Sequence, residues 1–214
     1  MKRRQQGITL ISMMIGLAIS LGVILTMLSL FQSLIVISLK SNQDAAQDGE
    51  VSTGLTTLQS MVQSAGYGLE ADVTPHIELA TTNVAQESTS LLWRYADGGA
   101  IRCEGVVELA SVDARTKKDM RVLTLLTASP CSETAKLGSL TWTASSTLSR
   151  FKNTSSQQTR LTLEQQDCTP FGVSALKAQH YVVGMHAPSS AVTAGVAGVE
   201  PIHYSVCLTN LTPG

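Results

Sequence analysis

The longest pattern along the chain is an apolar run near its beginning. No charged residue occurs between Ile8 and Leu39, and the basic residues Lys2, Arg3 and Arg4 precede this run. A helix needs about 20 apolar residues to cross the hydrocarbon core of a membrane, so the run is long enough to span one. Basic residues beside the first apolar segment tend to remain in the cytoplasm, which predicts that the chain after the run lies outside.

A short basic head followed by an apolar segment can also be a secretory signal peptide. The apolar region of such a signal has only about 7–15 residues and ends at a cleavage site made of small residues. Here the run is much longer, and small residues lie inside it at Gly16, Ala18, Ser20 and Gly22. The pattern therefore favours a helix that stays in the membrane.

A second helical pattern follows the apolar run. Residues 42–63 are more polar, but apolar side chains recur at the spacing of one helix face. These side chains are Val51, Leu55, Leu58, Met61, Val62 and Ala65. The stripe predicts an amphipathic helix.

Two interpretations of this region remain open, and they differ only at Ser41–Gly49. Either one long helix continues from the apolar run, or a membrane anchor ends there and a separate short helix follows. Gly49 and Gly54 each weaken a helix by up to about 1 kcal/mol. Gly66 and Gly68 are plausible helix ends, because glycine adopts the left-handed conformation that terminates helices.

The rest of the chain has the pattern of β-strands. Apolar and polar residues alternate in Arg160–Glu164 and Leu140–Thr143, as in a sheet with one face in water. The expected strands are Ser90–Tyr95, Ile101–Leu109, Met120–Ala128, Ser139–Thr143, Arg160–Glu164, Gln179–Met185 and Ile202–Thr209. The expected loops, rich in small and polar residues, are Ser145–Ser149, Thr154–Gln158 and Ala187–Gly198, the last being the most mobile.

Composition narrows the class of protein. Of the 214 residues, about 60 belong to the helical part and about 150 remain, which is one ordinary domain. Aromatic residues make up 4% and charged residues 14% of the chain, which fits a β-rich extracytoplasmic domain with polar loops. The formal net charge is −1, so the chain lacks the basic footprint of a nucleic-acid binder and no direct binding to nucleic acid is expected.

The cysteines predict disulfide bonds. Cys103, Cys131, Cys168 and Cys207 all lie in the part predicted to be outside, where an oxidising compartment favours two disulfides. Four cysteines allow three connectivities, and the pairs Cys103–Cys131 and Cys168–Cys207 are favoured because each would close one local loop. The spacing contains no Cys-x2-Cys or His-x3-His pair of the structural-zinc kind.

Residues with catalytic chemistry do not form a recognisable motif. The chain has no G-x-S-x-G, H-E-x-x-H, P-loop or G-x-G-x-x-G sequence. The histidines are scattered, and we interpret them as surface or partly packed side chains: His76, His180, His186 and His203. We interpret Trp93 and Trp142 as core residues. Neither an enzyme, a cofactor nor a metal site is expected.

The junction Gly7-Ile8-Thr9-Leu10-Ile11 closely resembles the cleavage site of type IV prepilins and of type II secretion pseudopilins. This resemblance implies that a prepilin peptidase cuts after Gly7 and methylates the new N-terminus at Ile8. The family usually has a glutamate at the fifth position of the mature chain, and Ser12 stands there instead.

Two internal segments carry a second resemblance. Ser64–Gly68 looks like the "AGY" signature that closes the long helix of PilW-type minor pilins. Leu91–Tyr95 followed by Arg102–Gly105 is similar to the strand, turn and C-x-G element of the same proteins. Together with the junction, these segments span Gly7 to Gly105, about half of the chain.

The resemblance implies an α+β, pilin-like fold in which a long N-terminal helix packs on a mainly antiparallel β-sheet domain. The implied parts are a leader, a transmembrane and fibre-core helix, an amphipathic helix half and a β-rich periplasmic domain, at residues 1–7, 8–40, 41–66 and 67–214. The implied location is the inner membrane, crossed once with the N-terminus in the cytoplasm, and afterwards the pilus at the cell surface.

The implied function is that of a minor pilin in a tip complex that initiates pilus assembly and supports adhesion, twitching motility or DNA uptake. The implied partners are the prepilin peptidase, other minor pilins, the major pilin and a PilY-type tip adhesin. Two alternatives remain open: a GspJ- or GspK-like pseudopilin of type II secretion, or a membrane-anchored binding domain that never enters a fibre.

Overall fold

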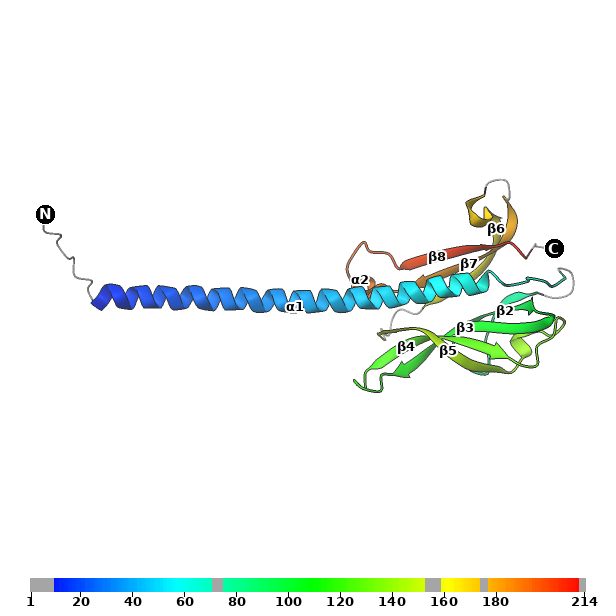
Figure 1. Ribbon diagram of the computed structural model, residues 1–214, viewed down its shortest axis with the longest axis horizontal. Helices are drawn as coiled ribbons and strands as arrows, with labels where there is room; N and C mark the ends of the chain where they lie inside the picture. The colour runs from blue at the N-terminus through cyan, green and yellow to red at the C-terminus, as the bar shows by residue number, and fades with distance from the viewer. Residues whose placement is uncertain (1–9, 71–74, 153–158, 174–176, 212–214) are drawn as a thin grey trace. The chain divides into compact units, whose positions relative to one another are not determined.

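A single helix dominates the first part of the chain. The computed structural model describes residues 10–70, 75–152, 159–173 and 177–211. In it, α1 runs without interruption from Leu10 to Val62 (Figure 1). The helix therefore continues through Ser41–Gly49, as in the first of the two interpretations. Contacts within the chain divide it into two compact units, residues 1–44 and 45–214.

The second unit contains two separate antiparallel sheets, so the α+β class expected from the sequence is confirmed. The first sheet has the order β1-β2-β3-β4-β5 and the second the order β6-β7-β8. The strands are β1 (Ile77–Ala80), β2 (Ser90–Asp97), β3 (Ala100–Val112), β4 (Asp119–Ala128), β5 (Trp142–Lys152), β6 (Arg160–Cys168), β7 (Ala178–Ala187) and β8 (Ile202–Leu208). Short helical turns are η1 (Leu137–Ser139), η2 (Pro170–Gly172) and α2 (Ser190–Thr193).

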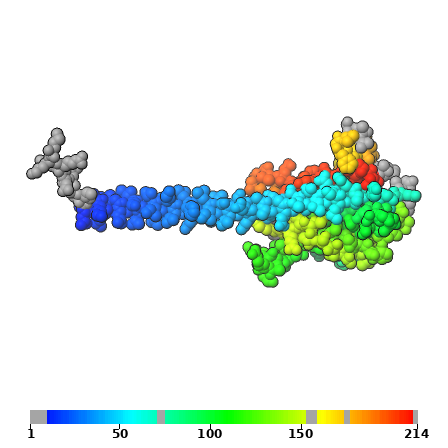
Figure 2. Space-filling model, viewed as in Figure 1, coloured from blue at the N-terminus to red at the C-terminus, as the bar shows by residue number. Residues whose placement is uncertain are grey.

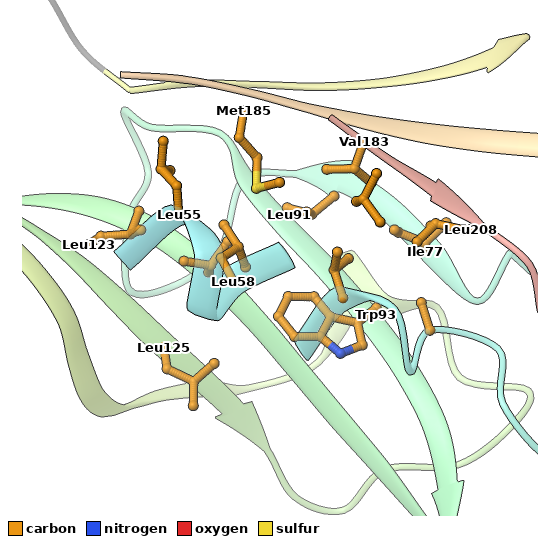
Figure 3. Close-up of a cluster of buried hydrophobic side chains, with 14 of the residues drawn as sticks. Leu55, Leu58, Ile77, Leu91, Trp93, Leu123, Leu125, Val183, Met185 and Leu208 are labelled. Carbon is orange, nitrogen blue, oxygen red and sulfur yellow. The ribbon is translucent and has the colours of Figure 1, made fainter. Parts of the chain in front are cut away.

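The second half of α1 lies between the two sheets and forms the main core with both of them. In Figure 2 the cyan part of the helix is flanked by the green and yellow first sheet and by the orange and red second sheet. Leu55 and Leu58 of the helix are buried with Trp93 of the first sheet and Met185 of the second (Figure 3). The apolar stripe of residues 51–65 was correctly interpreted as the buried face.

A smaller core covers the opposite face of the first sheet. Leu92 of β2 and Leu126 of β4 pack there with Trp142, and Leu137 of η1 closes the cluster. Because both faces of this sheet are covered, the β2 residues Ser90–Arg94 are all buried, without alternation.

Gly54 allows α1 to approach β5 closely. A Cβ added at this glycine would overlap with the Cβ of Ser149 and lie 3.2 Å from its hydroxyl oxygen. The helix-weakening glycine at this position therefore has a packing role. The helix itself ends at Val62, and Gly66, with φ of +75°, lies in the turn that follows.

Several boundaries differ from those predicted. The strand expected at Ser139–Thr143 begins only at Trp142, and it continues to Lys152 through Ser145–Ser149, which was wrongly predicted to be a loop. This stretch is rich in serine because β5 is an edge strand, where exposed positions need no apolar side chains. The short strand β1 was not predicted, and the expected loop Thr154–Gln158 lies outside the described residues.

Candidate functional site

The first candidate site is the apolar segment of α1. Every residue from Leu10 to Leu39 is exposed, including large side chains such as Phe31. Soluble monomers rarely expose apolar patches larger than a few hundred Å². The segment therefore needs an apolar partner, either lipid tails or other apolar helices.

Two hydroxyl groups in this segment form hydrogen bonds that suit an apolar environment. Thr26 donates a hydrogen bond to the carbonyl oxygen of Val23 at 2.8 Å, and Ser33 donates to that of Ser29 at 3.1 Å. Polar groups in lipid must find partners within the protein, and these bonds lie within the helix. The mean hydropathy reaches 2.3 over 18 residues, so α1 is a candidate membrane anchor.

The residues of the prepilin-like junction are only partly described. Gly7 and Ile8 lie outside the described residues, whereas Ser12 is an exposed residue in the first turn of α1. The peptidase site and the role of Ser12 remain expectations from the sequence.

The second half of α1 is fixed to both sheets by hydrogen bonds. The hydroxyl groups of Ser52 and Tyr204 of β8 lie 2.9 Å apart, and the Ser149 hydroxyl of β5 donates to the carbonyl oxygen of Glu50 at 3.0 Å. The carboxylate of Asp48 accepts bonds of 2.6 and 2.7 Å from the backbone N–H and hydroxyl of Ser190. These bonds hold the helix against both sheets and against α2.

Arg94 of β2 organises a loop of the second unit. Its buried guanidinium donates 2.6 Å hydrogen bonds to the carbonyl oxygens of Ser132 and Glu133, and it also donates to that of Ala135. Burial lowers the pKa of Arg94, while the charges of Glu78 and Glu133 oppose this effect. Sequence reasoning missed this role, although a single cation inside the apolar run of β2 was a signal for it.

Both cysteine pairs favoured by sequence separation are joined. Cys103 is bonded to Cys131 and Cys168 to Cys207, with Cα–Cα distances of 5.6 and 6.1 Å. The first disulfide ties β3 to the loop that Arg94 holds, because Cys131 directly precedes Ser132, whose carbonyl oxygen accepts a hydrogen bond from Arg94. The second ties the end of β6 to β8 across β7. Both disulfides therefore stabilise the unit that α1 carries.

A buried ion pair lies within the first sheet, and its carboxylate also binds the residue that precedes β6. Arg121 of β4 lies 2.6 Å from one carboxylate oxygen of Glu108 on β3, and both side chains are largely buried, at 13% and 6% exposure. The other oxygen accepts a 2.6 Å hydrogen bond from the backbone of Thr159, just before β6. This arrangement satisfies both carboxylate oxygens and is best explained as a structural link.

Two histidines come together on the outer face of the second sheet. His186 of β7 and His203 of β8 are direct neighbours in the register, and their rings stack at a centroid distance of 4.2 Å. Burial, then the charges of His203 and Arg160, lower the pKa of His186. Among the described residues, no group of three or more metal-binding side chains is found. Only the strand register, which the sequence did not provide, brings these rings together.

Comparison of the chain with protein families, curated proteins and solved structures finds no match. Its function must therefore be argued from its own residues and their arrangement.

Proposed function

We propose that this chain is a minor pilin of a type IV pilus, similar to the PilW type. The observation that carries the proposal is the change of surroundings along one unbroken helix. From Leu10 to Leu39 the helix is apolar and exposed, and from Val51 to Val62 it supplies the core between two sheets. Such a helix can anchor the chain in a bilayer and later pack against similar helices in a fibre. The prepilin-like junction at residues 7–11 supports the same function.

Ser12 supports a position at or near the tip of the fibre. In the resembling family, the glutamate at this position pairs with the N-terminal amine of the subunit above. A buried carboxylate without a partner is costly, so a subunit with nothing above it is better served by a neutral residue. Its partners in this proposal are other minor pilins, the major pilin and a PilY-type adhesin.

Processing at Gly7 tests the proposal. Produced together with a prepilin peptidase, the chain should lose residues 1–7 and carry a methyl group on Ile8, as measured by mass spectrometry. Gly7→Val should block this cleavage. Gly16→Val is the matched control, because a Cβ at Gly16 meets no atom within 4 Å. Intact Met1 on the membrane-bound protein would refute a pilin function and favour a permanently anchored binding domain.

The tip position has a separate test. Ser12→Glu should lower the number of pili per cell, because it places in the fibre core a carboxylate whose burial costs several kcal/mol. Ser12→Gln adds similar volume without charge and should leave piliation nearly unchanged. A cryo-electron-microscopy map of the pilus with another pilin's N-terminus beside Ser12 would contradict this placement.

A further inference from the structure

Three basic side chains form a row across the second sheet. Arg160 of β6 lies directly opposite His186 of β7, which in turn lies directly opposite His203 of β8. Residues that face each other in antiparallel strands project from the same side of the sheet, with Cβ atoms about 5 Å apart. Met185, next to His186 in the sequence, is packed in the main core, so the row lies on the outer side. The whole row belongs to the second unit, and its three strands are neighbours in Figure 1.

The three side chains of the row are also close to one another. The rings of His186 and His203 are stacked with their centroids 4.2 Å apart. Burial, then the charges of His203 and Arg160, lower the pKa of His186, so the guanidinium lies within electrostatic reach of this ring. Protonation of the rings therefore brings positive charges together, and an anion bound between them would offset the repulsion.

Hydroxyl groups form the next row along the same strands. Thr162 of β6 and Ser205 of β8 lie opposite Gly184 of β7, one from each side. A Cβ added at Gly184 would overlap with the Thr162 hydroxyl oxygen and lie 3.7 Å from Nε2 of His186. The Thr162 hydroxyl and the His186 ring nitrogen therefore border the same space above Gly184, which has no side chain of its own. This places a hydroxyl donor beside the basic row.

The row has no counter-ion among the residues that the structure describes. Arg160 and His203 are exposed and His186 is half-buried, and none of the three forms an ion pair or a side-chain hydrogen bond with another described residue. His180 is a further titratable group on the same side of β7. The carboxylates of the surrounding segments are Glu87, Glu108, Glu164 and Glu200, of which Glu108 is paired with Arg121. The row is therefore a local group of unneutralised donors in a chain whose formal net charge is −1.

We propose that this row binds a phosphate-type oxyanion. The Arg160 guanidinium offers two parallel N–H donors, the arrangement that matches phosphate oxygens. The protonated imidazoles of His186 and His203 each donate from a ring nitrogen, and the Thr162 hydroxyl adds another donor. Donors from three strands suit the three free oxygens of a phosphate group better than the two of a carboxylate. The site depends neither on the membrane anchor nor on the pilus function proposed above.

Isothermal titration calorimetry of the full chain in detergent with inorganic phosphate tests the site. At about pH 6.5, where histidine is partly protonated, we expect saturable binding. Arg160→Gln should weaken this binding about tenfold through the loss of charge-assisted hydrogen bonds. Arg115→Gln is the matched control, because it removes the same charge from an exposed position on the turn between β3 and β4 of the first sheet. Equal weakening by both substitutions would show attraction to the net charge alone and would overturn the proposal.

Sulfate isolates the contribution of the histidines, because it keeps its double charge from about pH 7.5 to pH 5.5 while the imidazoles gain protons. Its affinity should rise about tenfold over this range. His186→Asn combined with His203→Asn should abolish the rise and leave weak binding by Arg160. In NMR titrations, phosphate should raise the pKa of the His186 and His203 rings and leave that of His180 unchanged. An affinity for sulfate that stays constant with pH would show that the histidines take no part and would overturn the proposal.

Two further probes identify the class of ligand. Glycerol 3-phosphate that binds as tightly as inorganic phosphate shows that the phosphate group alone is recognised, whereas tighter binding identifies an organic phosphate monoester. Two histidines can also hold a metal ion, whose affinity rises with pH because its imidazole ligands must be neutral. Zn²⁺ binding that requires both histidines, without any binding of phosphate, would identify a metal site and overturn the proposal. Unchanged thermal unfolding of the variants confirms that they are folded.

Discussion

At the scale of single residues, Arg94 orders one loop of the second unit. A fully buried cation is costly, and here the cost is offset by the carbonyl oxygens of three residues of one loop, Ser132, Glu133 and Ala135. Without the guanidinium these carbonyl oxygens would lose their hydrogen-bond donor, and without them the guanidinium would lose its acceptors. Arg94 therefore stabilises the loop by satisfying several acceptors at once.

Replacing Arg94 with methionine should lower the free energy of unfolding by about 3 kcal/mol, because several buried carbonyls would lose their donor. Urea denaturation of the full chain in detergent measures this change. Arg102→Met is the control, since Arg102 pairs with Asp97 at the surface, where both side chains are more than half exposed, at 57% and 56%. Such a surface pair contributes at most about 1 kcal/mol. Equal effects of the two substitutions would contradict the role given to Arg94.

The stacked histidines predict a dependence of stability on pH. The pKa of His186 is lowered in the folded state, so below the ordinary histidine pKa of about 6.5 the unfolded chain binds more protons than the folded one. Stability is therefore complete above that pH and falls as the pH decreases through and below it. The melting temperature measured from pH 7.5 to pH 5 should show this fall.

His186→Gln should reduce the slope, because glutamine does not titrate and leaves His203 with one positive neighbour fewer. His180→Gln provides the comparison on the same strand, because the His180 ring is not part of the stacked pair. If the melting temperature changes with pH equally in His186→Gln and in the original chain, the histidine pair is not the source of the pH dependence.

At the scale of elements, some positions of α1 are exposed and others pack against the sheets. Two glycines show this difference: Gly49 faces open space, whereas Gly54 lies against β5. A helix gains about 1 kcal/mol when an exposed glycine is replaced by alanine. At a packed position the added methyl group also causes overpacking, which costs about 1–3 kcal/mol. This cost outweighs the gain in helix stability.

Gly54→Ala should therefore destabilise the protein by up to about 2 kcal/mol, because the new methyl group overlaps with Ser149. Gly49→Ala should stabilise it by up to about 1 kcal/mol. Thermal unfolding of both variants measures the difference in sign. Stabilisation by both substitutions would show that α1 does not approach β5 this closely.

Elements with a strong local pattern were predictable from the sequence. The apolar run and the stripe from Val51 to Ala65 indicated α1, and the cysteine spacing indicated both disulfides. The edge strand β5 was partly missed because its exposed positions carry serine and threonine instead of alternating apolar residues. Strand β1 was missed because four residues are too few to show a period.

At the scale of the whole molecule, the features that could not be predicted all depend on pairing between distant segments. The division of the strands into two sheets with a helix between them follows from tertiary contacts that no local pattern encodes. The same holds for the His186–His203 pair and for the Arg94 loop, which need the register and the chain path. A pocket lined by Gln47 of α1, Met120 of β4 and Phe151 of β5 likewise brings together segments that lie far apart in sequence.

The close fit of Gly54 against Ser149 also has a mechanical consequence. If the helix were pulled along its axis by one turn, about 5.4 Å, Glu50 or Leu58 would face Ser149 in place of Gly54. Their side chains cannot fit there, because even a Cβ at Gly54 would overlap with Ser149. Tension on α1 is therefore resisted by steric interlocking as well as by the bonds of Asp48 and Ser52, which bear the load in parallel. The folded unit should travel with its helix under force instead of sliding along it.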